Sequence, residues 1–171
     1  MRVEVRIAGL GGQGIIMAGF LLAVAACIHG GRNAVQTRSY GPEARGGACR
    51  SDVVIDDGEI DYPRAIKPDI LVAMSQQAYD RYVDDVKPGG IIVLDPDLIP
   101  ERRPKPNVRV FKVPARRIAE GLGYPIAANV VMLGALTSIT GVVEAEHVRR
   151  AVAENVPRGM VEVNLKAFEA G

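Results

Sequence analysis

The sequence is poor in several residue types that particular functions need. Its 171 residues contain no tryptophan, and aromatic residues make up 5% of the chain. That argues against the stacking surfaces that bind single-stranded nucleic acid. The 21 lysines and arginines nearly balance the 20 aspartates and glutamates, for a formal net charge of +1, whereas a nucleic-acid-binding domain usually carries a strongly basic field. We therefore expect no nucleic-acid partner.

Metal and disulfide chemistry have few candidate residues. The chain has two cysteines, Cys27 and Cys49, and two histidines, His29 and His147. Two thiols are too few for the four ligands of a typical iron–sulfur cluster, and the histidines lie too far apart to form a metal-ligand motif. We predict no metal site. The two thiols allow one disulfide, although disulfides are rare in cytoplasmic proteins.

Targeting and membrane signals are also missing. The N-terminus, MRVEVRIAG, lacks the charged and then apolar layout of a signal peptide. The apolar stretch 15–28 is shorter than the roughly 20 residues that cross a bilayer. We expect a cytoplasmic protein with no membrane partner. The length and the 48% hydrophobic content predict one globular domain over residues 1–171.

Strand-like and helix-like segments alternate along the chain. Alternating or continuous apolar runs predict strands at 3–8, 33–37, 48–55, 70–74, 91–94 and 108–113, with a hairpin return at 59–61. Apolar or amphipathic periodicity predicts helices at 14–28, 75–86, 114–120, 129–139, 144–155 and 164–170. The first helix is apolar on most faces, which predicts burial on most sides. The alternation predicts an α/β fold, a single Rossmann-like domain with a mostly parallel sheet flanked by helices.

A glycine-rich loop joins the first strand to the first helix. Gly9, Gly11 and Gly14 match the G-x-G-x-x-G pattern, with Gly12 and Gln13 between them. Glycine admits positive φ and lets backbone N–H groups approach a phosphate, and a helix N-terminus adds partial positive charge. The same glycines also suit a tight strand-to-helix crossover with no ligand. The loop is therefore a candidate phosphate site.

An ordinary dinucleotide site needs an acidic residue about 20 residues after the loop to hold the ribose. The chain has no aspartate or glutamate between Glu4 and Glu43. Arg38, near the end of the second predicted strand, suits a 2′-phosphate instead, so a freestanding NADP-dependent oxidoreductase is one alternative. That alternative predicts tight NADP binding by the isolated chain.

A second polar segment, RSYGPEARGG, covers residues 38–47 and is expected to be a loop. Its guanidinium groups suit phosphate or carboxylate, and its glycines permit sharp bends. If the first two strands are neighbours, this loop leaves the sheet at the same end as the glycine loop, where ligands of α/β sheets bind. We expect it to contact a ligand or a partner. Its candidate site residues are Arg38, Ser39, Tyr40, Gly41, Glu43, Arg45, Gly46 and Gly47.

No catalytic constellation stands out. The chain has neither the G-x-S-x-G elbow nor the P-loop pattern. Ser75 follows a buried strand, so it is a candidate for the ligand edge, although a helix N-cap explains it equally. We predict no catalytic residue in this chain.

Four segments together carry a family resemblance. GLGGQGI at 9–15, QTRSYGPEARGG at 36–47, PDILVAMSQQAYD at 68–80 and NLKAFEAG at 164–171 closely resemble the gamma subunit of 2-oxoacid:ferredoxin oxidoreductases. The first two segments in combination are highly specific, and the resemblance covers nearly the whole chain.

The resemblance implies the chemistry. Such enzymes convert a 2-oxoacid, CoA and oxidised ferredoxin to an acyl-CoA, CO2 and reduced ferredoxin, and thiamine diphosphate carries the carbanion. Thiamine diphosphate and magnesium are then expected on alpha and beta partner subunits, and iron–sulfur clusters on partners such as a ferredoxin-like delta subunit. This chain would hold none of these cofactors, would be inactive alone and would contact CoA. The form of the 36–47 segment favours 2-oxoglutarate as the substrate. A purely structural assembly subunit is the other alternative.

Overall fold

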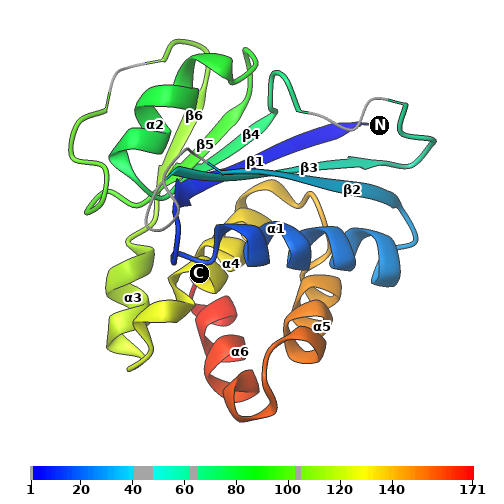
Figure 1. Ribbon diagram of the computed structural model, residues 1–171, viewed down its shortest axis with the longest axis vertical. Helices are drawn as coiled ribbons and strands as arrows, with labels where there is room; N and C mark the ends of the chain where they lie inside the picture. The colour runs from blue at the N-terminus through cyan, green and yellow to red at the C-terminus, as the bar shows by residue number, and fades with distance from the viewer. Residues whose placement is uncertain (1, 41–47, 62–64, 103–104) are drawn as a thin grey trace.

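Six strands form one sheet in the order β2-β3-β1-β4-β5-β6 (Figure 1). The computed structural model describes residues 2–40, 48–61, 65–102 and 105–171. The strands are β1 (Val3–Leu10), β2 (Asn33–Tyr40), β3 (Ala48–Asp56), β4 (Ile70–Ala73), β5 (Ile91–Leu94) and β6 (Arg109–Lys112).

The sheet is mostly parallel, as expected. β1 pairs in parallel with β4, β4 with β5, and β5 with β6. β3 pairs antiparallel with both β1 and β2. Because β1 and β2 are both antiparallel to β3, they run in the same direction, and β3 alone runs against the other strands. The expected single α/β domain is confirmed.

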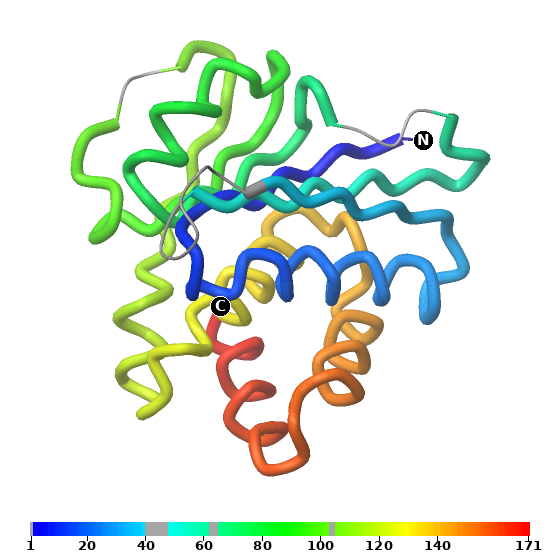
Figure 2. The backbone as a smooth tube through the Cα atoms, in the orientation of Figure 1, coloured from blue at the N-terminus to red at the C-terminus, as the bar shows by residue number. Residues whose placement is uncertain are grey.

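Helices cover both faces of this sheet (Figure 1). Their bounds are α1 (Ile15–Val24), η1 (Ala25–His29, a π-helical turn), α2 (Gln76–Tyr82), η2 (Val83–Asp85), α3 (Ala115–Gly121), η3 (Pro125–Ala127), α4 (Ala128–Thr140), α5 (Ala145–Asn155), η4 (Arg158–Met160) and α6 (Val161–Ala170). The smaller core lies between α2 and the sheet. The larger core lies between the sheet and α1, α3, α4 and α5, and α6 packs beneath α4 (Figure 2).

Local chemistry accounts for several of the boundaries. β4 and β5 are buried along their whole length, as expected for central parallel strands covered on both faces. α2 begins at Ser75, whose hydroxyl accepts a hydrogen bond from the backbone N–H of Ala78 at 3.1 Å. α4 ends at Gly141, which has φ of 62°, a conformation that glycine adopts without strain.

The strand neighbours differ from the simplest expectation. β1 lies beside β3, not β2, yet β2 still ends at the same end of the sheet as β1. Tyr40 at the end of β2 lies opposite Cys49 of β3, and Cys49 lies opposite Gly9 of β1. The expected proximity of the two loops therefore holds through a different topology, because the β2–β3 hairpin folds back against β1.

Two boundaries are corrected. β2 extends to Tyr40, so Arg38 and Ser39 belong to a strand and not to a loop. The predicted hairpin return at 59–61 does not form; those residues have no strand structure. The partner of β3 is instead the preceding strand, β2.

The burial predicted for the first helix is only partly right. The inner side of α1 is buried, but Met17 and Phe20 are each 42% exposed, and Ile28 in η1 is 69% exposed. The helix is apolar all round, yet one of its sides faces away from this domain.

Candidate functional site

The glycine loop lies between the end of β1 and the start of α1. Gly12 has φ of 89° and Gly14 has φ of 75°, values that only glycine adopts readily. Gly11 and Gly12 are exposed, and a Cβ placed on Gly12 would meet open space. The loop therefore presents backbone to the surface at the positive end of α1.

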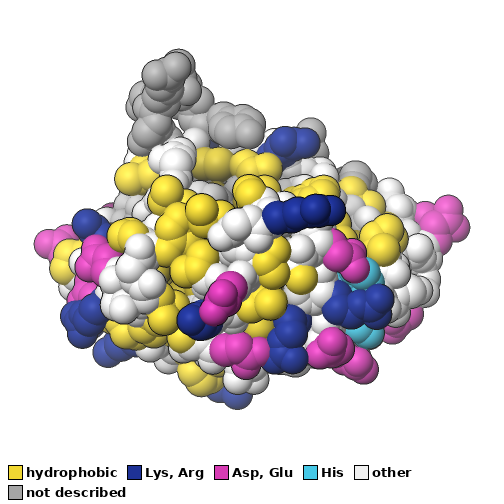
Figure 3. Space-filling model, turned by 90° about the horizontal axis from the view of Figure 1, so that it is seen from below, with side chains coloured by type: hydrophobic (Ala, Val, Ile, Leu, Met, Phe, Trp, Pro, Cys, Tyr) yellow, Lys and Arg dark blue, Asp and Glu magenta, His cyan; other side chains and the backbone are white. Residues whose placement is uncertain are grey.

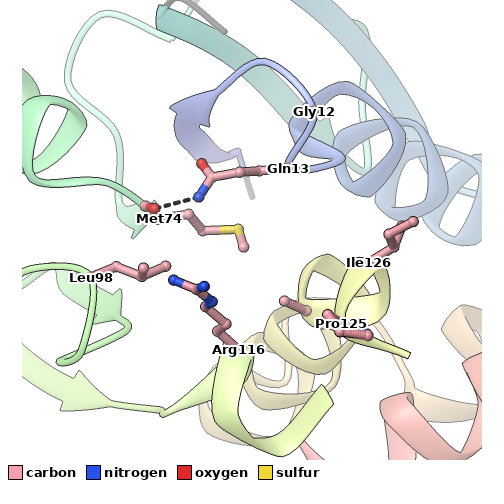
Figure 4. Close-up of a pocket in the computed structure, with 8 residues that line it drawn as sticks. Gly12, Gln13, Met74, Leu98, Arg116, Pro125 and Ile126 are labelled. Atoms are coloured by element: carbon pink, nitrogen blue, oxygen red, sulfur yellow. Dashed lines mark hydrogen bonds between the residues drawn. The ribbon is translucent and has the colours of Figure 1, made fainter. Parts of the chain in front are cut away.

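Gln13 fastens this loop to the sheet. Its Oε1 accepts a hydrogen bond from the backbone N–H of Leu10 at 2.7 Å. Its Nε2 donates to the backbone carbonyl of Met74 at 2.9 Å (Figure 4). Because both ends of the amide are bonded within the protein, Gln13 shapes the loop, and its polar atoms are already engaged before any ligand binds.

Gly9 and Gly14 have no room for a side chain. A Cβ on Gly9 would clash with Oε1 of Gln13, and a Cβ on Gly14 would clash with the amide of Asn129. Asn129, near the start of α4, donates from Nδ2 to the carbonyl of Gly14 at 3.2 Å. These two glycines therefore serve close packing, whereas Gly11 and Gly12 form the exposed part of the loop.

A cleft of about 290 Å³ opens beside the loop (Figure 4). It lies between the loop, the segments that follow β4 and β5, and the starts of α3 and α4. Among the described residues, the lining is apolar except for Gln13 and one cation, Arg116. The residues that line it are Gly12, Gln13, Met74, Leu98, Arg116, Pro125, Ile126 and Ala128.

Arg116 projects its guanidinium into the cleft from the first turn of α3 (Figure 4). Its backbone N–H donates to Oδ2 of Asp95 at 3.0 Å, and its Nε donates to Glu120 at 3.1 Å. Asp95 is fully buried, and its Oδ1 accepts from the backbone N–H of Asp97 at 2.9 Å. The carboxylate of Asp95 thus fixes the start of α3 and, with it, the base of Arg116.

Sequence reasoning missed Arg116 and Asp95. The available signal was positional: Asp95 directly follows the buried strand β5, and Arg116 lies in the first turn of α3, the helix that follows β6. The carboxyl ends of parallel strands meet at the ligand edge of such a sheet. The sequence analysis predicted residues 114–120 only as a helix, and an arginine in a predicted helix does not by itself indicate a ligand site.

The other predicted site residues fall into two groups. Ser75 is buried and serves as the N-cap of α2, while the neighbouring Met74 lines the cleft. Arg38 and Ser39 are exposed on β2, and Tyr40 ends that strand. The remaining candidates, Gly41, Glu43, Arg45, Gly46 and Gly47, lie outside the described residues.

The topology also bears on the dinucleotide alternative. In a nucleotide-binding sheet of the usual kind, the carboxyl end of a neighbouring parallel strand carries the ribose acid. Here β3 occupies that side of β1, and its first residues, Ala48 and Cys49, lie opposite Leu10 and Gly9. The residues beside the glycine loop are therefore the first residues of an antiparallel strand, and neither Ala48 nor Cys49 is an acid that could hold a ribose.

The two cysteines are not among the described residues that line the cleft. Cys27 is exposed and Cys49 is buried, and both are free thiols. Burial raises the pKa of the Cys49 thiol. Within the described part of the chain, His, Cys, Asp and Glu side chains nowhere gather in threes to hold a metal ion, and no described helix is long and apolar enough to span a bilayer.

Comparison with known proteins identifies the family. The family model for pyruvate ferredoxin/flavodoxin oxidoreductase matches residues 4–171. The chain belongs to this family. It is 53% identical to 2-oxoglutarate synthase subunit KorC of Methanocaldococcus jannaschii, over all of this chain and 92% of that one. It is also 40% identical to ketoisovalerate oxidoreductase subunit VorA of Methanothermobacter marburgensis. That match covers 99% of this chain and 36% of VorA.

Solved structures of family members have the same fold. The gamma subunit of keto/oxoacid ferredoxin oxidoreductase from Geobacter sulfurreducens superposes with a TM-score of 0.89 at 43% identity, over 98% of this chain and 95% of that one. A chain of 2-oxoglutarate:ferredoxin oxidoreductase from Magnetococcus marinus, solved with 2-oxoglutarate, coenzyme A and succinyl-CoA bound, gives 0.88 at 23% identity, over 98% and 30%. The resemblance to the gamma subunit of these oxidoreductases is confirmed, and the chain is a subunit of that type of enzyme.

Proposed function

We propose that this chain is the gamma subunit of a 2-oxoglutarate:ferredoxin oxidoreductase. The observation that supports 2-oxoglutarate as the substrate is the 53% identity, over the whole chain, to a subunit of an enzyme named 2-oxoglutarate synthase. The complex would convert 2-oxoglutarate, CoA and oxidised ferredoxin to an acyl-CoA, CO2 and reduced ferredoxin. Residues 1–171 would form its one gamma-type domain, in the cytoplasm.

The chemistry would take place on partner subunits. Thiamine diphosphate, when bound with magnesium between alpha and beta subunits, supplies the carbanion chemistry, and iron–sulfur clusters on partners such as a delta subunit take the electrons. The described residues of this chain contribute backbone amides, an arginine and apolar walls at the cleft, and no nucleophile or acid–base pair lines it. The isolated chain is therefore expected to be inactive.

The cleft fits one part of CoA. Its exposed glycine backbone and the positive end of α1 suit a phosphate, Arg116 adds a guanidinium, and its apolar residues suit the uncharged pantetheine arm. A volume of about 290 Å³ is at the lower limit of roughly 300 Å³ for ligand pockets. One guanidinium also falls short of the three phosphates of CoA. We therefore propose that the cleft binds CoA in part and that arginines such as Arg38 or Arg45, or a partner subunit, bind the rest.

Calorimetric titration of CoA into the intact complex tests this assignment. Arg116→Ala removes the cleft cation and is expected to weaken CoA binding about tenfold, the effect of about 1.4 kcal/mol. Arg117→Ala is the matched control, because Arg117 lies on the same helix and also forms an ion pair, with Asp97 at 2.7 Å, but is not among the residues that line the cleft. Unchanged CoA affinity in Arg116→Ala would refute CoA binding in the cleft. Unchanged CoA affinity in Arg45→Ala would refute a role for Arg45 in CoA binding.

Two further measurements test the substrate and the alternatives. The purified complex should turn over 2-oxoglutarate with a higher kcat/KM than pyruvate or a branched-chain 2-oxoacid, and the reverse order would refute the substrate assignment. The isolated chain should neither bind NADP tightly, as read by cofactor fluorescence, nor turn over any 2-oxoacid. NADP binding by the isolated chain would favour the freestanding oxidoreductase, and CoA affinity independent of every variant would favour a purely structural subunit.

A further inference from the structure

A buried carboxylate beside the cleft has no cation next to it. Asp95 directly follows β5 and is 0% exposed, and within the described part of the chain no lysine, arginine or histidine forms an ion pair with it. A buried charge is costly unless hydrogen bonds satisfy it. Its oxygens accept from the backbone N–H groups of Asp97 at 2.9 Å and Arg116 at 3.0 Å. Pro114, the N-cap of α3, provides no side-chain hydrogen bond to its own helix, so Asp95 caps α3 from the end of β5.

The segment that carries Asp95 is itself held firmly. The backbone carbonyl of Asp95 accepts from the N–H groups of Leu98 at 3.2 Å and Ile99 at 3.1 Å, and Ile99 is fully buried. Three residues on, the side-chain amide of Gln76 in α2 donates to the carbonyl of Glu101 at 2.6 Å and accepts from its N–H at 3.0 Å. The bond from Asp95 therefore ties the backbone of α3 to a fixed part of the sheet edge.

The guanidinium of Arg116 is held at one nitrogen and left open at the other two. Its Nε donates to Glu120 at 3.1 Å, and no hydrogen bond to a described residue engages its two Nη atoms. Figure 4 shows the group pointing into the cleft. Two adjacent N–H donors of this kind match two oxygens of one phosphate. Because the backbone and Nε are already fixed, a bound phosphate has less freedom to remove from this side chain.

Other cations on the helix-covered side use their outer nitrogens differently. On the face that Figure 3 shows, Lys and Arg side chains lie next to Asp and Glu side chains at several places. Arg149 of α5, for example, donates from Nη1 to Glu146 at 3.2 Å. Arg116 differs because its ion pair with Glu120 uses Nε and leaves the outer pair of donors toward the cleft.

We propose that Asp95 is a positioning residue for CoA, whose carboxylate holds the backbone of Arg116 so that the guanidinium meets a phosphate of CoA in the cleft. Asp95 does not itself line the cleft, so it acts on the ligand through Arg116. The proposal rests on the proposed function, because it takes CoA as the ligand of the cleft.

The direction of the effect distinguishes positioning from charge. Asp95→Asn keeps the shape of the side chain and removes its negative charge. By charge alone, the loss of a carboxylate near the cleft would strengthen the binding of an anionic ligand. The amide nitrogen donates and cannot accept, so one of the two bonds to Asp97 and Arg116 is lost. Positioning therefore requires the opposite result, weaker CoA binding.

Calorimetric titration of CoA into the intact complex, together with kinetics at varied CoA concentration, tests this role. We expect Asp95→Asn to raise the Kd and the KM for CoA about threefold to tenfold, as for residues coupled in one hydrogen-bond network, with the loss in KM rather than in kcat. In an Arg116→Ala background the same change should alter the Kd by less than about twofold, because Asp95 acts through Arg116. Asp97→Asn is the matched control. It removes a carboxylate from the same turn, but its partner Arg117 does not line the cleft, so CoA affinity should stay unchanged.

The outcomes separate two failures. If Arg116→Ala itself leaves CoA affinity unchanged, the assignment of CoA to the cleft fails, and the role of Asp95 fails with it. If Arg116→Ala weakens binding while Asp95→Asn leaves it unchanged or strengthens it, the positioning role alone is refuted. Weakening by Asp95→Asn that is equally large in the Arg116→Ala background also refutes it, because the effect then passes through another part of the fold. Thermal unfolding of each purified complex identifies loss of folding, and Asp95→Ser, whose hydroxyl can accept one of the two bonds, replaces Asp95→Asn if that variant does not fold.

Discussion

Replacing Gln13 should destabilise the glycine loop by an amount that its two hydrogen bonds define. Gln13→Ala removes the bond from the N–H of Leu10 to Oε1, 2.7 Å long, and the bond from Nε2 to the carbonyl of Met74, 2.9 Å long. At about 1 kcal/mol for each bond, the free energy of unfolding should fall by about 2 kcal/mol. For a chain of this size, that lowers Tm by about 4–8 °C.

Gln13→Glu separates the two bonds. The carboxylate still accepts from Leu10, but its second oxygen now faces the carbonyl of Met74, to which it cannot donate. Protonation restores a donor, so the folded state should raise the pKa of Glu at this position above its ordinary value of about 4.3. The stability of this variant is therefore fully present below the unfolded pKa and is lost as pH rises through the folded pKa.

Differential scanning calorimetry between pH 3.5 and 8 measures both variants against wild type. We expect Gln13→Glu to resemble Gln13→Ala at pH 7 and to approach wild type at the acidic end. Hydrogen exchange at the Leu10 amide gives a local readout, and it should be faster in Gln13→Ala than in Gln13→Glu. A Gln13→Ala change in Tm below about 1 °C, or a Gln13→Glu variant as stable as wild type at pH 7, would refute the assigned role of this amide.

Other variants test other parts of the chain. Gly14→Ala should lower the free energy of unfolding by more than the roughly 1–2 kcal/mol of a left-handed alanine, because its Cβ would also clash with the side chain of Asn129. Gly12→Ala, whose Cβ faces open space, should lower it by no more than that amount. Chemical denaturation compares the two variants, and equal losses of stability would contradict the packing argument. Alkylation at pH 8 should modify exposed Cys27 at least about tenfold faster than buried Cys49, because burial raises the pKa of the Cys49 thiol. Mass spectrometry measures the two rates, and equal rates would contradict this prediction. Arg6→Ala breaks the buried ion pair of Arg6 with Asp52 and should lower the free energy of unfolding by about 3–5 kcal/mol. Chemical denaturation measures this change, and a loss below about 1 kcal/mol would mean that the pair contributes no more than a surface ion pair.

The sequence predicts the parallel part of the fold well because its strands carry unambiguous patterns. Continuous apolar runs at 70–74 and 91–94 match β4 and β5, which are buried on both faces. The tail helix begins earlier than predicted, at Val161. Local signals such as Ser75 and Gly141 mark where helices begin and end. These features depend on short-range chemistry, which a single sequence contains in full.

Strand order is harder to predict because it depends on long-range pairing. Nothing in the residues of β1 says that β3, rather than β2, will lie beside it. The pattern of β1 is misleading in a second way, because its charged residues alternate with apolar ones as in a strand exposed on one face. Glu4 and Arg6 are buried. Arg6 bonds to Asp52 at 2.9 Å and to Asp85 at 3.0 Å, groups brought there by β3 and η2.

The candidate site divides along the same line. The sequence locates the glycine loop, and the structure shows that only part of it faces outward, because Gln13 and Gly14 are held by internal contacts. Arg116 is brought to the cleft by the order of β4, β5 and β6, so its place after a strand points to the cleft only once that order is known. A residue whose function depends on the order of the strands becomes visible only when the sheet is assembled.

The position of the cleft at the start of α1 bears on where CoA should bind more tightly. The loop that lines the cleft continues directly into α1, whose outer side carries Met17 and Phe20. A subunit that covers this side would bring new side chains close to Gly12 and enlarge a site that holds about 290 Å³ and one arginine. Burial of that site would also strengthen the interaction of Arg116 with a phosphate, because charge interactions grow as water is excluded. CoA affinity should therefore be lower in the isolated chain than in the assembled complex, and calorimetric titration of CoA into each would measure the difference.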